Sequence, residues 1–197
     1  EVRRQLRDYV AAISDRYQGN PFHNFEHCSH VTMASIKLLK RIVVPDSKDT
    51  SQLKGSNCHA YGITSNALAQ FAIAFCALIH DVDHPGVPNG QLAKELPELG
   101  QKYKNQSVAE QNSVDIAWNL LMNPHFRDLQ ACIFSNEKEL VGFRQYVANL
   151  VIATDIFNPT MKNLRNQRWE KAFNDSPSDD ASVDDKARSN LKATIVL

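Results

Sequence analysis

The amino-acid sequence predicts an all-α fold, and three observations support that class. Apolar residues recur every three or four positions along most of the 197 residues, which is the period of an amphipathic helix. Proline, glycine and asparagine interrupt this pattern at intervals that suit helices and turns. No stretch alternates apolar and polar residues over the length of a convincing strand, and no segment is repeated. We therefore expect a compact domain of several helices.

Breaks in the helical pattern set the limits of the first three expected helices. Residues 2–18 carry apolar side chains at helical spacing, and a Gly-Asn-Pro sequence ends that helix. The second helix, residues 24–44, ends where a proline follows it. Residues 46–64 are polar and rich in glycine, serine and asparagine, which indicates a surface loop. Ser65 can cap the third helix, an apolar run that ends at His80.

Helix-breaking residues also divide the rest of the chain into short segments. Residues 91–96 form a short helix before a proline, and residues 98–106 have the composition of a polar connector. Ser107 and Glu110 have the spacing of a capping box, which predicts a helix from there to Met122. The remaining expected helices cover residues 125–134, 136–155, 161–173 and 184–197, the last preceded by an acidic, serine-containing segment.

Composition argues against several classes of protein. A hydrophobic content of 43% with 22% charged residues is ordinary for a globular domain, and a net charge of zero with a pI of about 7.3 gives no reason to expect nucleic acid or an anionic membrane as a partner. The longest apolar run, residues 71–79, is about half a membrane span. The four cysteines lack CxxC spacing, which favours reduced thiols. We therefore expect a cytoplasmic domain, or the cytosolic domain of a membrane-anchored protein.

Ionisable side chains crowd the end of the apolar third helix. His80 and Asp81 complete the run, and Asp83 and His84 follow before a Pro-Gly pair breaks the helix. Unpaired burial of such groups costs several kcal/mol, so they are expected to pair with one another or with a metal ion. The plainer alternative is a capped helix end with a solvated Asp/His turn, in which Asp83 is only a turn residue.

The second expected helix adds His23 and His27, four residues apart and therefore on one face. Alone, such a pair is more often structural than metal-bound. With His80 and Asp81, however, His27 completes a set of nitrogen and oxygen ligands that suits a catalytic Zn²⁺ ion. The second carboxylate oxygen of Asp81 can bridge to a harder ion such as Mg²⁺ or Mn²⁺. Two ions ~3.5–4 Å apart that share a hydroxide are suited to in-line attack at phosphorus. Cys28 is a further candidate ligand, although a small buried side chain is the simpler interpretation.

Two motifs together resemble the paired signature of the class I 3′,5′-cyclic nucleotide phosphodiesterases, a branch of the HD-type metallohydrolases. The first is FHNFEH at residues 22–27, and the second is HDVDHPG at residues 80–86. Shorter agreements occur at residues 107–110 and 153–155. The resemblance covers nearly the whole chain. It implies that residues 1–197 are the N-terminal and middle portion of an all-α catalytic domain that continues past residue 197. It also implies hydrolysis of cAMP, cGMP or both to 5′-monophosphates in cyclic nucleotide signalling.

The resemblance also implies a role for each matching residue. His27, His80 and Asp81 are metal ligands, with Asp81 in contact with both ions, and His23 is the general acid for the departing 3′ oxygen. His84, Glu110 and Thr154 hold metal-bound waters and orient the ligands, while Phe22, Asn24 and Asp155 are weaker candidates for the substrate pocket. Plainer alternatives stay open for two of these carboxylates: Glu110 as a helix cap and Asp155 as a helix-end residue.

Three features depart from the family pattern without removing a metal ligand. Phe22 replaces a tyrosine, His30 replaces an aspartate, and Gln111, Asn112 and Ser113 stand where the family has an Asn-His-His run. These departures predict a divergent member of the family rather than an inactive one. Any hydrogen bonds that the missing histidines make must be replaced by other groups.

A larger departure concerns groups that the family places after this point in the chain, namely a last aspartate ligand and the residues that grip the purine. Asp155, Asp184 and Asp185 are poor substitutes, because the first matches another motif and the others begin a polar helix. We therefore expect the 197-residue piece alone to be inactive and to belong to a larger, multidomain protein, for which an oligomer is compatible with the sequence. Two alternatives remain: an inactive module that binds a cyclic nucleotide or a partner, and an HD-type phosphohydrolase of another nucleotide.

Overall fold

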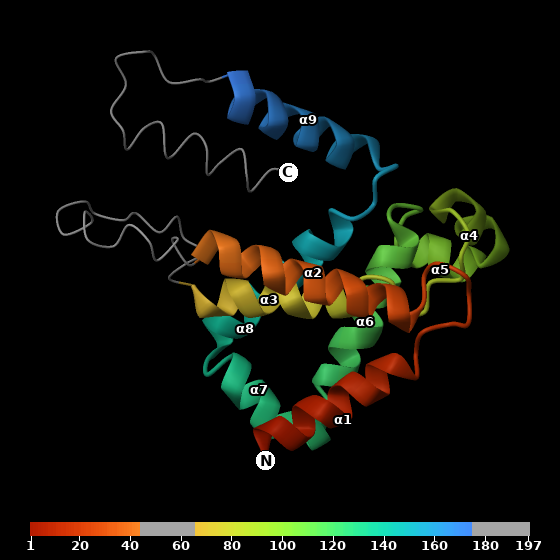
Figure 1. Cartoon of the computed structure of the whole chain (residues 1–197). Coiled ribbons are helices and arrows are strands. Elements are labelled where there is room, and N and C mark those ends of the chain that lie inside the picture. Colours follow the sequence, from red (N-terminus) through yellow and green to blue (C-terminus); the bar gives the residue numbers. More distant parts are fainter. Residues whose placement is uncertain (44–65, 175–197) are drawn as a thin grey trace, which may run out of the picture. The chain divides into compact units, whose positions relative to one another are not determined.

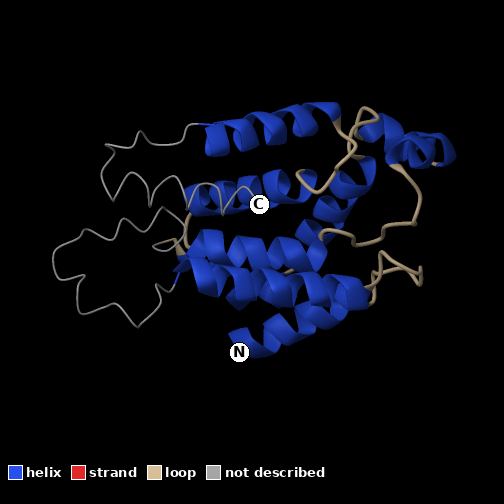
Figure 2. Cartoon of the chain, turned by 45° about the horizontal axis from the view of Figure 1, so that its top comes forward, coloured by secondary structure: helices blue, strands red, loops and turns tan. Residues whose placement is uncertain are grey.

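The computed structural model describes residues 1–43 and 66–174, which contain helices and loops and no strand (Figure 2). The all-α prediction is confirmed. In chain order the helices are α1 (Val2–Ser14), α2 (Phe25–Val43), α3 (Ala67–Ile79), α4 (Asn89–Glu95), α5 (Pro97–Lys102), α6 (Val108–Leu121), α7 (Arg127–Ile133), α8 (Glu137–Ile152) and α9 (Pro159–Asn174), with a short 3₁₀ helix, η1 (Pro124–Phe126), before α7 (Figure 1).

The chain divides into two compact units, each of which is described by itself. The first, Glu1–Thr154, contains α1 to α8. Within it, α2 packs along α3, α3 and α6 both pack on α8, and α1 lies across α6 and α7. The second unit, Asp155–Leu197, contributes α9 to the described residues. In the described part of the chain, no helix is both long enough and apolar enough to cross a bilayer.

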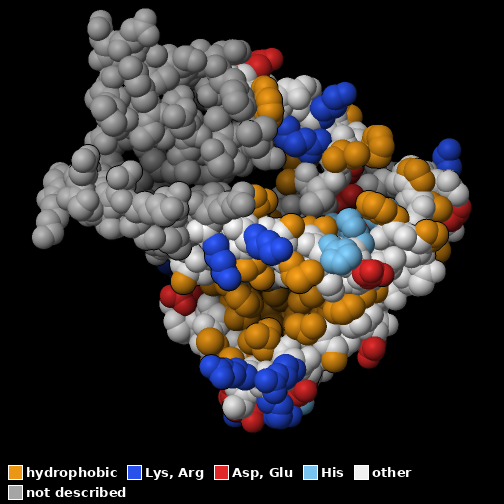
Figure 3. Space-filling model, in the orientation of Figure 1, with side chains coloured by type: hydrophobic (Ala, Val, Ile, Leu, Met, Phe, Trp, Pro, Cys, Tyr) orange, Lys and Arg blue, Asp and Glu red, His pale blue; other side chains and the backbone are white. Residues whose placement is uncertain are grey.

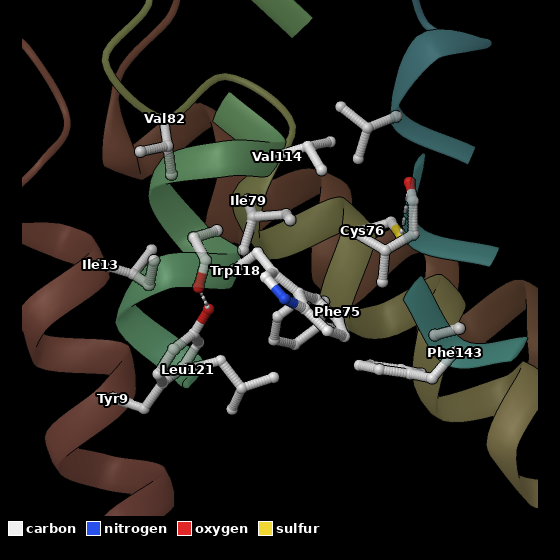
Figure 4. Close-up of a cluster of buried hydrophobic side chains, with 14 of the residues drawn as sticks. Tyr9, Ile13, Phe75, Cys76, Ile79, Val82, Val114, Trp118, Leu121 and Phe143 are labelled. Atoms are coloured by element: carbon white, nitrogen blue, oxygen red, sulfur yellow. Dashed lines mark hydrogen bonds between the residues drawn. The ribbon is translucent and has the colours of Figure 1, made fainter. Parts of the chain in front are cut away.

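The core of the first unit is an aromatic cluster where α1, α3, α6 and α8 meet (Figure 4). The ring of Tyr9 stacks on that of Phe75 at 5.6 Å, and the ring of Phe143 meets Phe75 edge-on at 5.4 Å. The buried hydroxyl of Tyr9 donates a hydrogen bond of 2.9 Å to the carbonyl oxygen of Ala117, which ties α1 to α6. The cluster fixes α3, and therefore also fixes where the polar residues at the end of α3 must lie.

An apolar hollow of about 330 Å³ lies between α1, α2 and α3 (Figure 3). Leu6 and Val10 of α1, Met33 of α2, and Phe71 and Leu78 of α3 are among its lining residues. The hollow is lined by the apolar sides of α1 and α2 and by one side of α3, a helix that is apolar almost all round because its other side packs in the core. It contains none of the histidines, so it is separate from the polar cluster described below.

Two local predictions are wrong, and both failures have a physical reason. Residues 98–106 are not a plain connector, because α5 begins at Pro97, where a proline at the first helical position needs no hydrogen-bond partner for its nitrogen. Ser107 does not cap α6 with its side chain, because it adopts a left-handed conformation with φ of 41°. Instead, Oδ1 of Asn89 accepts a hydrogen bond of 2.8 Å from the backbone N–H of Ala109.

The remaining differences concern helix limits. α1 ends at Ser14, four residues before its expected end, and the chain then turns towards α2. The side chain of Asn66 caps α3 by accepting a hydrogen bond from Ala69 N–H at 2.9 Å. The expected cap at Ser65, the loop over 46–64 and the helix over 184–197 lie outside the described residues.

Candidate metal centre

The site lies where the start of α2 meets the end of α3, and the histidines gather there on the face shown in Figure 3. α2 begins at Phe25, because Oδ1 of Asn24 accepts a hydrogen bond of 2.9 Å from the backbone N–H of His27. α3 ends at Ile79, and the turn that follows carries His80, Asp81 and His84. The apolar side of α3 is anchored in the core, so the turn projects from a fixed helix end.

His27, His80 and Asp81 form one group whose ligand atoms all lie within 4.8 Å of one another. Nε2 of His80 is 3.2 Å from Oδ2 of Asp81, and Nε2 of His27 is 3.8 Å from the same oxygen. Nδ1 of His80 lies 3.0 Å from the carbonyl oxygen of Ala77. Because that oxygen can only accept, Nδ1 carries the proton, which leaves Nε2 as the atom available to a metal ion.

The protonation states in this group suit a divalent cation, which binds carboxylate and neutral imidazole. Burial would raise the pKa of Asp81, but hydrogen bonds and charge from His80 and His23 outweigh it and hold the pKa at about 2. Burial lowers the pKa of His27, which favours its neutral form. Burial also opposes protonation of His80, yet the hydrogen bond and charge of Asp81 give a net rise in its pKa. A cation bound here would replace the proton of His80 as the positive charge beside Asp81. The donor set therefore fits the metal ion expected from the sequence.

A second group, His23, Asp81 and His84, shares the carboxylate of Asp81. Nδ1 of His23 lies 2.8 Å from Oδ2 of Asp81. The imidazole rings of His23 and His84 stack with their centroids 3.8 Å apart and their planes 17° apart. Burial and the neighbouring His23 lower the pKa of His84, and its Nδ1 accepts a hydrogen bond of 3.0 Å from Gly86 N–H. One carboxylate oxygen of Asp81 thus lies within 3.8 Å of a ring nitrogen of His23, His27 and His80. The ring of His84 stacks on that of His23.

Phe22 lies on the open side of the cluster. Its side chain is 61% exposed, and its ring centroid is 4.4 Å from that of His27 and 5.0 Å from that of His23.

Cys28 is fully buried one position after His27, and its sulfur donates to the carbonyl oxygen of Phe25 at 3.2 Å. Cys28 belongs to neither ligand group among the described residues, which agrees with the interpretation as a small buried side chain.

Glu110 is tied to the site by a residue that the sequence analysis missed. Nδ2 of Asn89 donates a hydrogen bond of 2.9 Å to Oε2 of Glu110, while Oδ1 of Asn89 caps α6. The charge of Glu110 also contributes to the raised pKa of His80, although less than Asp81 and the Ala77 carbonyl do. Asn89 therefore orients a carboxylate that acts on the cluster. Its position at the first residue of α4, soon after the HDVDHPG motif, was the available sequence signal.

The segment that replaces the family's Asn-His-His run makes its own hydrogen bonds to the turn after α3. Nδ2 of Asn112 donates to Oδ2 of Asp83 at 3.1 Å, and the buried hydroxyl of Ser113 donates to the carbonyl oxygen of Val82 at 2.6 Å. The other carboxylate oxygen of Asp83 accepts from Nε2 of Gln18 at 2.8 Å. Asp83 therefore links this turn to α6 and to the segment after α1, which is more than a plain turn residue does.

Three other predicted residues have the following places in the structure. His30 is exposed on α2. The hydroxyl of Thr154 donates to the carbonyl oxygen of Val151 at 2.7 Å, within the end of α8. Asp155 opens the second unit, where its Oδ1 accepts hydrogen bonds from the backbone N–H groups of Phe157 at 3.0 Å and Asn158 at 3.1 Å. The roles predicted for Thr154 and Asp155 stay predictions.

Comparison with known proteins decides the family. Residues 22–196 match the family model of the 3′5′-cyclic nucleotide phosphodiesterases. The chain belongs to this family. It is 32% identical over 153 residues to the 3′,5′-cyclic-AMP phosphodiesterase isoform F of Drosophila melanogaster, an alignment that covers 76% of this chain and 20% of that protein. It is 29% identical over 154 residues to the high affinity cGMP-specific 3′,5′-cyclic phosphodiesterase 9A of Mus musculus, covering 77% of this chain and 24% of that one.

The phosphodiesterase fold is also seen in a solved structure. The phosphodiesterase domain of the RhoPDE fusion protein from the choanoflagellate Salpingoeca rosetta aligns with a TM-score of 0.64 at 19% sequence identity, covering 98% of this chain and 52% of that one. The present chain spans about a fifth of the length of its curated relatives from Drosophila and mouse. It therefore corresponds to part of the proteins that carry those names.

Proposed function

We propose that this phosphodiesterase-family chain supplies the metal ligands and the general acid of an enzyme that hydrolyses the 3′ phosphoester bond of cAMP, cGMP or both, giving the 5′-monophosphate in cyclic nucleotide signalling. One observation carries the proposal. His23, His27 and His80 all approach a single carboxylate oxygen of Asp81, at 2.8, 3.8 and 3.2 Å. The names of relatives that act on cAMP and on cGMP support this choice of substrates.

Two divalent cations suit the ligands, and we assign Zn²⁺ to one position and Mg²⁺ or Mn²⁺ to the other. His27, His80 and Asp81 would hold the first, and Asp81 would also contact the second. When bound, such ions lower the pKa of water to provide a nucleophile at neutral pH and offset the negative charge that develops at phosphorus. The hydrogen bond from His80 Nδ1 to the carbonyl oxygen of Ala77, 3.0 Å, keeps the imidazole in the orientation that this requires.

His23 acts as the general acid in this proposal. As the bond between phosphorus and O3′ breaks, O3′ gains negative charge and takes a proton from Nε2 of His23. Asp81 accepts a hydrogen bond from Nδ1–H of the same ring at 2.8 Å, so its carboxylate fixes the ring and offsets the positive charge of the imidazolium form. A positioned general acid of this kind is typically worth ~10²–10⁴ in rate.

The other residues of the prediction keep the roles that the family resemblance implies. We assign to His84, Glu110 and Thr154 the holding of waters and the orientation of the ligands, which the His84 ring stack and the Asn89 contact to Glu110 support. Phe22 is exposed beside the rings and suits a pocket wall. Asn24 and Asp155 are weaker pocket candidates, since each already accepts backbone hydrogen bonds.

We also propose that the chain works in the cytosol as part of a larger, multidomain protein. Cys28, Cys76 and Cys132 are free thiols, and the first two are buried, which supports a reducing compartment. The much greater length of the Drosophila and mouse relatives supports the larger protein.

Turnover and metal content test the proposed function. Hydrolysis of cAMP and cGMP would be measured with Zn²⁺ and Mg²⁺, both for the 197-residue chain and for any longer chain that the gene encodes. We expect turnover by the longer chain and a loss of ~10²–10⁴ in kcat for His23→Ala. His125→Ala is a matched control, because His125 is half exposed and contacts Asp8 rather than Asp81. No turnover of either nucleotide by a folded, metal-loaded longer chain would overturn the proposal and favour an inactive binding module.

A further inference from the structure

The side chain of Asn20 joins the two segments that carry the stacked histidines. Its Nδ2 donates one hydrogen bond of 2.9 Å to the backbone carbonyl oxygen of His23 and another of 2.9 Å to that of His84. These are the two residues whose rings stack at 3.8 Å. His23 belongs to the segment before α2 and His84 to the turn after α3. A single amide group therefore fixes how far apart the two backbones lie.

The orientation of this amide is fixed from its other side. Oδ1 of Asn20 accepts from the backbone N–H of Phe22 at 3.2 Å, so the oxygen and nitrogen of the amide cannot exchange places without losing all three bonds. The Asn20 side chain also lies against Gly86, which has a φ of +81° and whose N–H holds Nδ1 of His84. A Cβ at Gly86 would be 3.8 Å from Cβ and Cγ of Asn20. The amide of Asn20 is partly buried, and these contacts fix its orientation.

We propose that Asn20 is a positioning residue that sets the stacking of the His23 ring on the His84 ring, and through it the contact between His23 and Asp81. The inference rests on the proposed function, in which His23 is the general acid. A general acid must present its proton within hydrogen-bond reach of the leaving group, so a shift of the ring by a fraction of an ångström lowers the rate. Asn20 touches neither the reacting atoms nor the ligand atoms, and acts only through the two backbones.

Gln18 provides a matched control for this role. Its Nε2 donates to Oδ1 of Asp83 at 2.8 Å and to the Asp83 carbonyl oxygen at 3.4 Å, so it connects the same two segments with the same chemical group. It does not contact the carbonyl oxygen of His23 or His84. Gln18→Ala therefore removes a similar amount of hydrogen bonding between the segments while leaving the amide bridge of Asn20 in place.

The test that needs no turnover is NMR of the histidine ring protons in the metal-free 197-residue chain. Stacked rings displace the resonances of each other's carbon-bound protons from their free values. We expect Asn20→Ala to reduce this displacement for His23 and His84 by more than half, and Gln18→Ala to leave it within about a tenth, while both keep the helical circular dichroism. Asn20→Asp serves as the second variant, because it keeps the shape and the Oδ1 acceptor but lacks the Nδ2 donor.

Unchanged ring-proton displacements in folded Asn20→Ala or Asn20→Asp would overturn the proposal, and so would an equal loss in Gln18→Ala. In a chain that shows turnover, we expect Asn20→Ala to lower kcat by ~10–100-fold, as for residues that orient a site, with KM within about twofold. Gln18→Ala should change kcat by less than about threefold. If the unmutated protein hydrolyses neither nucleotide, the proposed function fails, whereas the ring-proton result still decides whether Asn20 sets the stack.

Discussion

The aromatic core and the histidine cluster lie at neighbouring points of α3, yet they are held together by different kinds of interaction. Phe75 and Ile79 face the core, where rings meet at centroid distances of 5.4 to 6.3 Å. One residue further, His80 and Asp81 begin a cluster that is held by polar contacts between named atoms and by the stack of the His23 ring on that of His84. Burial in the core is non-directional and depends on volume, whereas each polar contact in the cluster depends on one donor and one acceptor.

This difference predicts how the two regions respond to substitution. The core should be sensitive to the removal of volume and tolerant of changes that keep shape. The cluster should be sensitive to changes that keep shape but alter charge or hydrogen bonding, because its groups are partly buried and have few alternative partners. The following variants test each half of the comparison, with a matched control in each case.

Phe143→Ala should give the largest effect, because it removes volume from the centre of the core. The ring is fully buried and lies against those of Phe71, Phe75 and Trp118. Deletion of such a ring costs ~3–5 kcal/mol in the free energy of unfolding, which urea denaturation would measure. Val141→Ala on the same helix is the control, because Val141 is 55% exposed. Equal losses in the two variants would show that the core does not depend on Phe143.

Asp81→Asn keeps the shape of a cluster side chain and removes its charge. We expect the affinity for Zn²⁺ to fall by ~100-fold or more, because loss of a ligand should cost at least as much as loss of a group that orients one. The titration would be followed by calorimetry and by the rise in melting temperature that the metal produces. Asp8→Asn is the control, because this exposed carboxylate pairs with Arg4 and His125, outside both candidate ligand groups. Unchanged zinc affinity in Asp81→Asn would exclude Asp81 as a ligand.

The fold could be predicted from the sequence largely because helices are local. The period of apolar residues and the prolines after α2, α4 and α6 give the order of the described helices. The prediction failed where one residue has two roles or where its partner is distant in sequence. Pro97 follows α4 and also starts α5, and the start of α6 is capped by Asn89 rather than by Ser107.

The site shows the same division. His23, His27, His80 and Asp81 could be found because ligand chemistry restricts which side chains can serve, and the structure brings all four together. Asn20 could not be found in this way. Its amide bridges to a carbonyl oxygen 64 residues away, and an asparagine beside glycine and proline is already explained by a turn. Side chains that position others leave little trace in a single sequence, because backbone carbonyls carry no residue identity.

Tyr9→Phe is the core counterpart of Asp81→Asn, since it keeps the shape and removes one polar atom. The carbonyl oxygen of Ala117 would lose the hydrogen bond of 2.9 Å that the Tyr9 hydroxyl donates. We expect a loss of ~1–2 kcal/mol in the free energy of unfolding, well below that of Phe143→Ala. Tyr146→Phe is the control, because Tyr146 is 39% exposed and its hydroxyl accepts a long contact of 3.5 Å from Nδ2 of Asn66. A loss as large as that of Phe143→Ala would contradict the view of the core as volume-dependent.

Asp115 gives the smallest effect, since it tests a polar contact that lies outside both regions. Burial would raise the pKa of Asp115, but hydrogen bonds from Lys102 at 2.8 Å and Tyr103 at 2.9 Å outweigh it and lower the pKa. A carboxylate whose pKa is lowered on folding stabilises the protein above its unfolded pKa of about 3.9, and this contribution is lost as the pH falls through the folded pKa. Asp115→Asn should therefore cost less than ~1 kcal/mol at neutral pH, because Lys102 is 54% exposed and water screens the pair. Urea denaturation should show the difference shrinking as the pH is lowered below about 4, and a difference independent of pH would show that the charge of Asp115 contributes nothing.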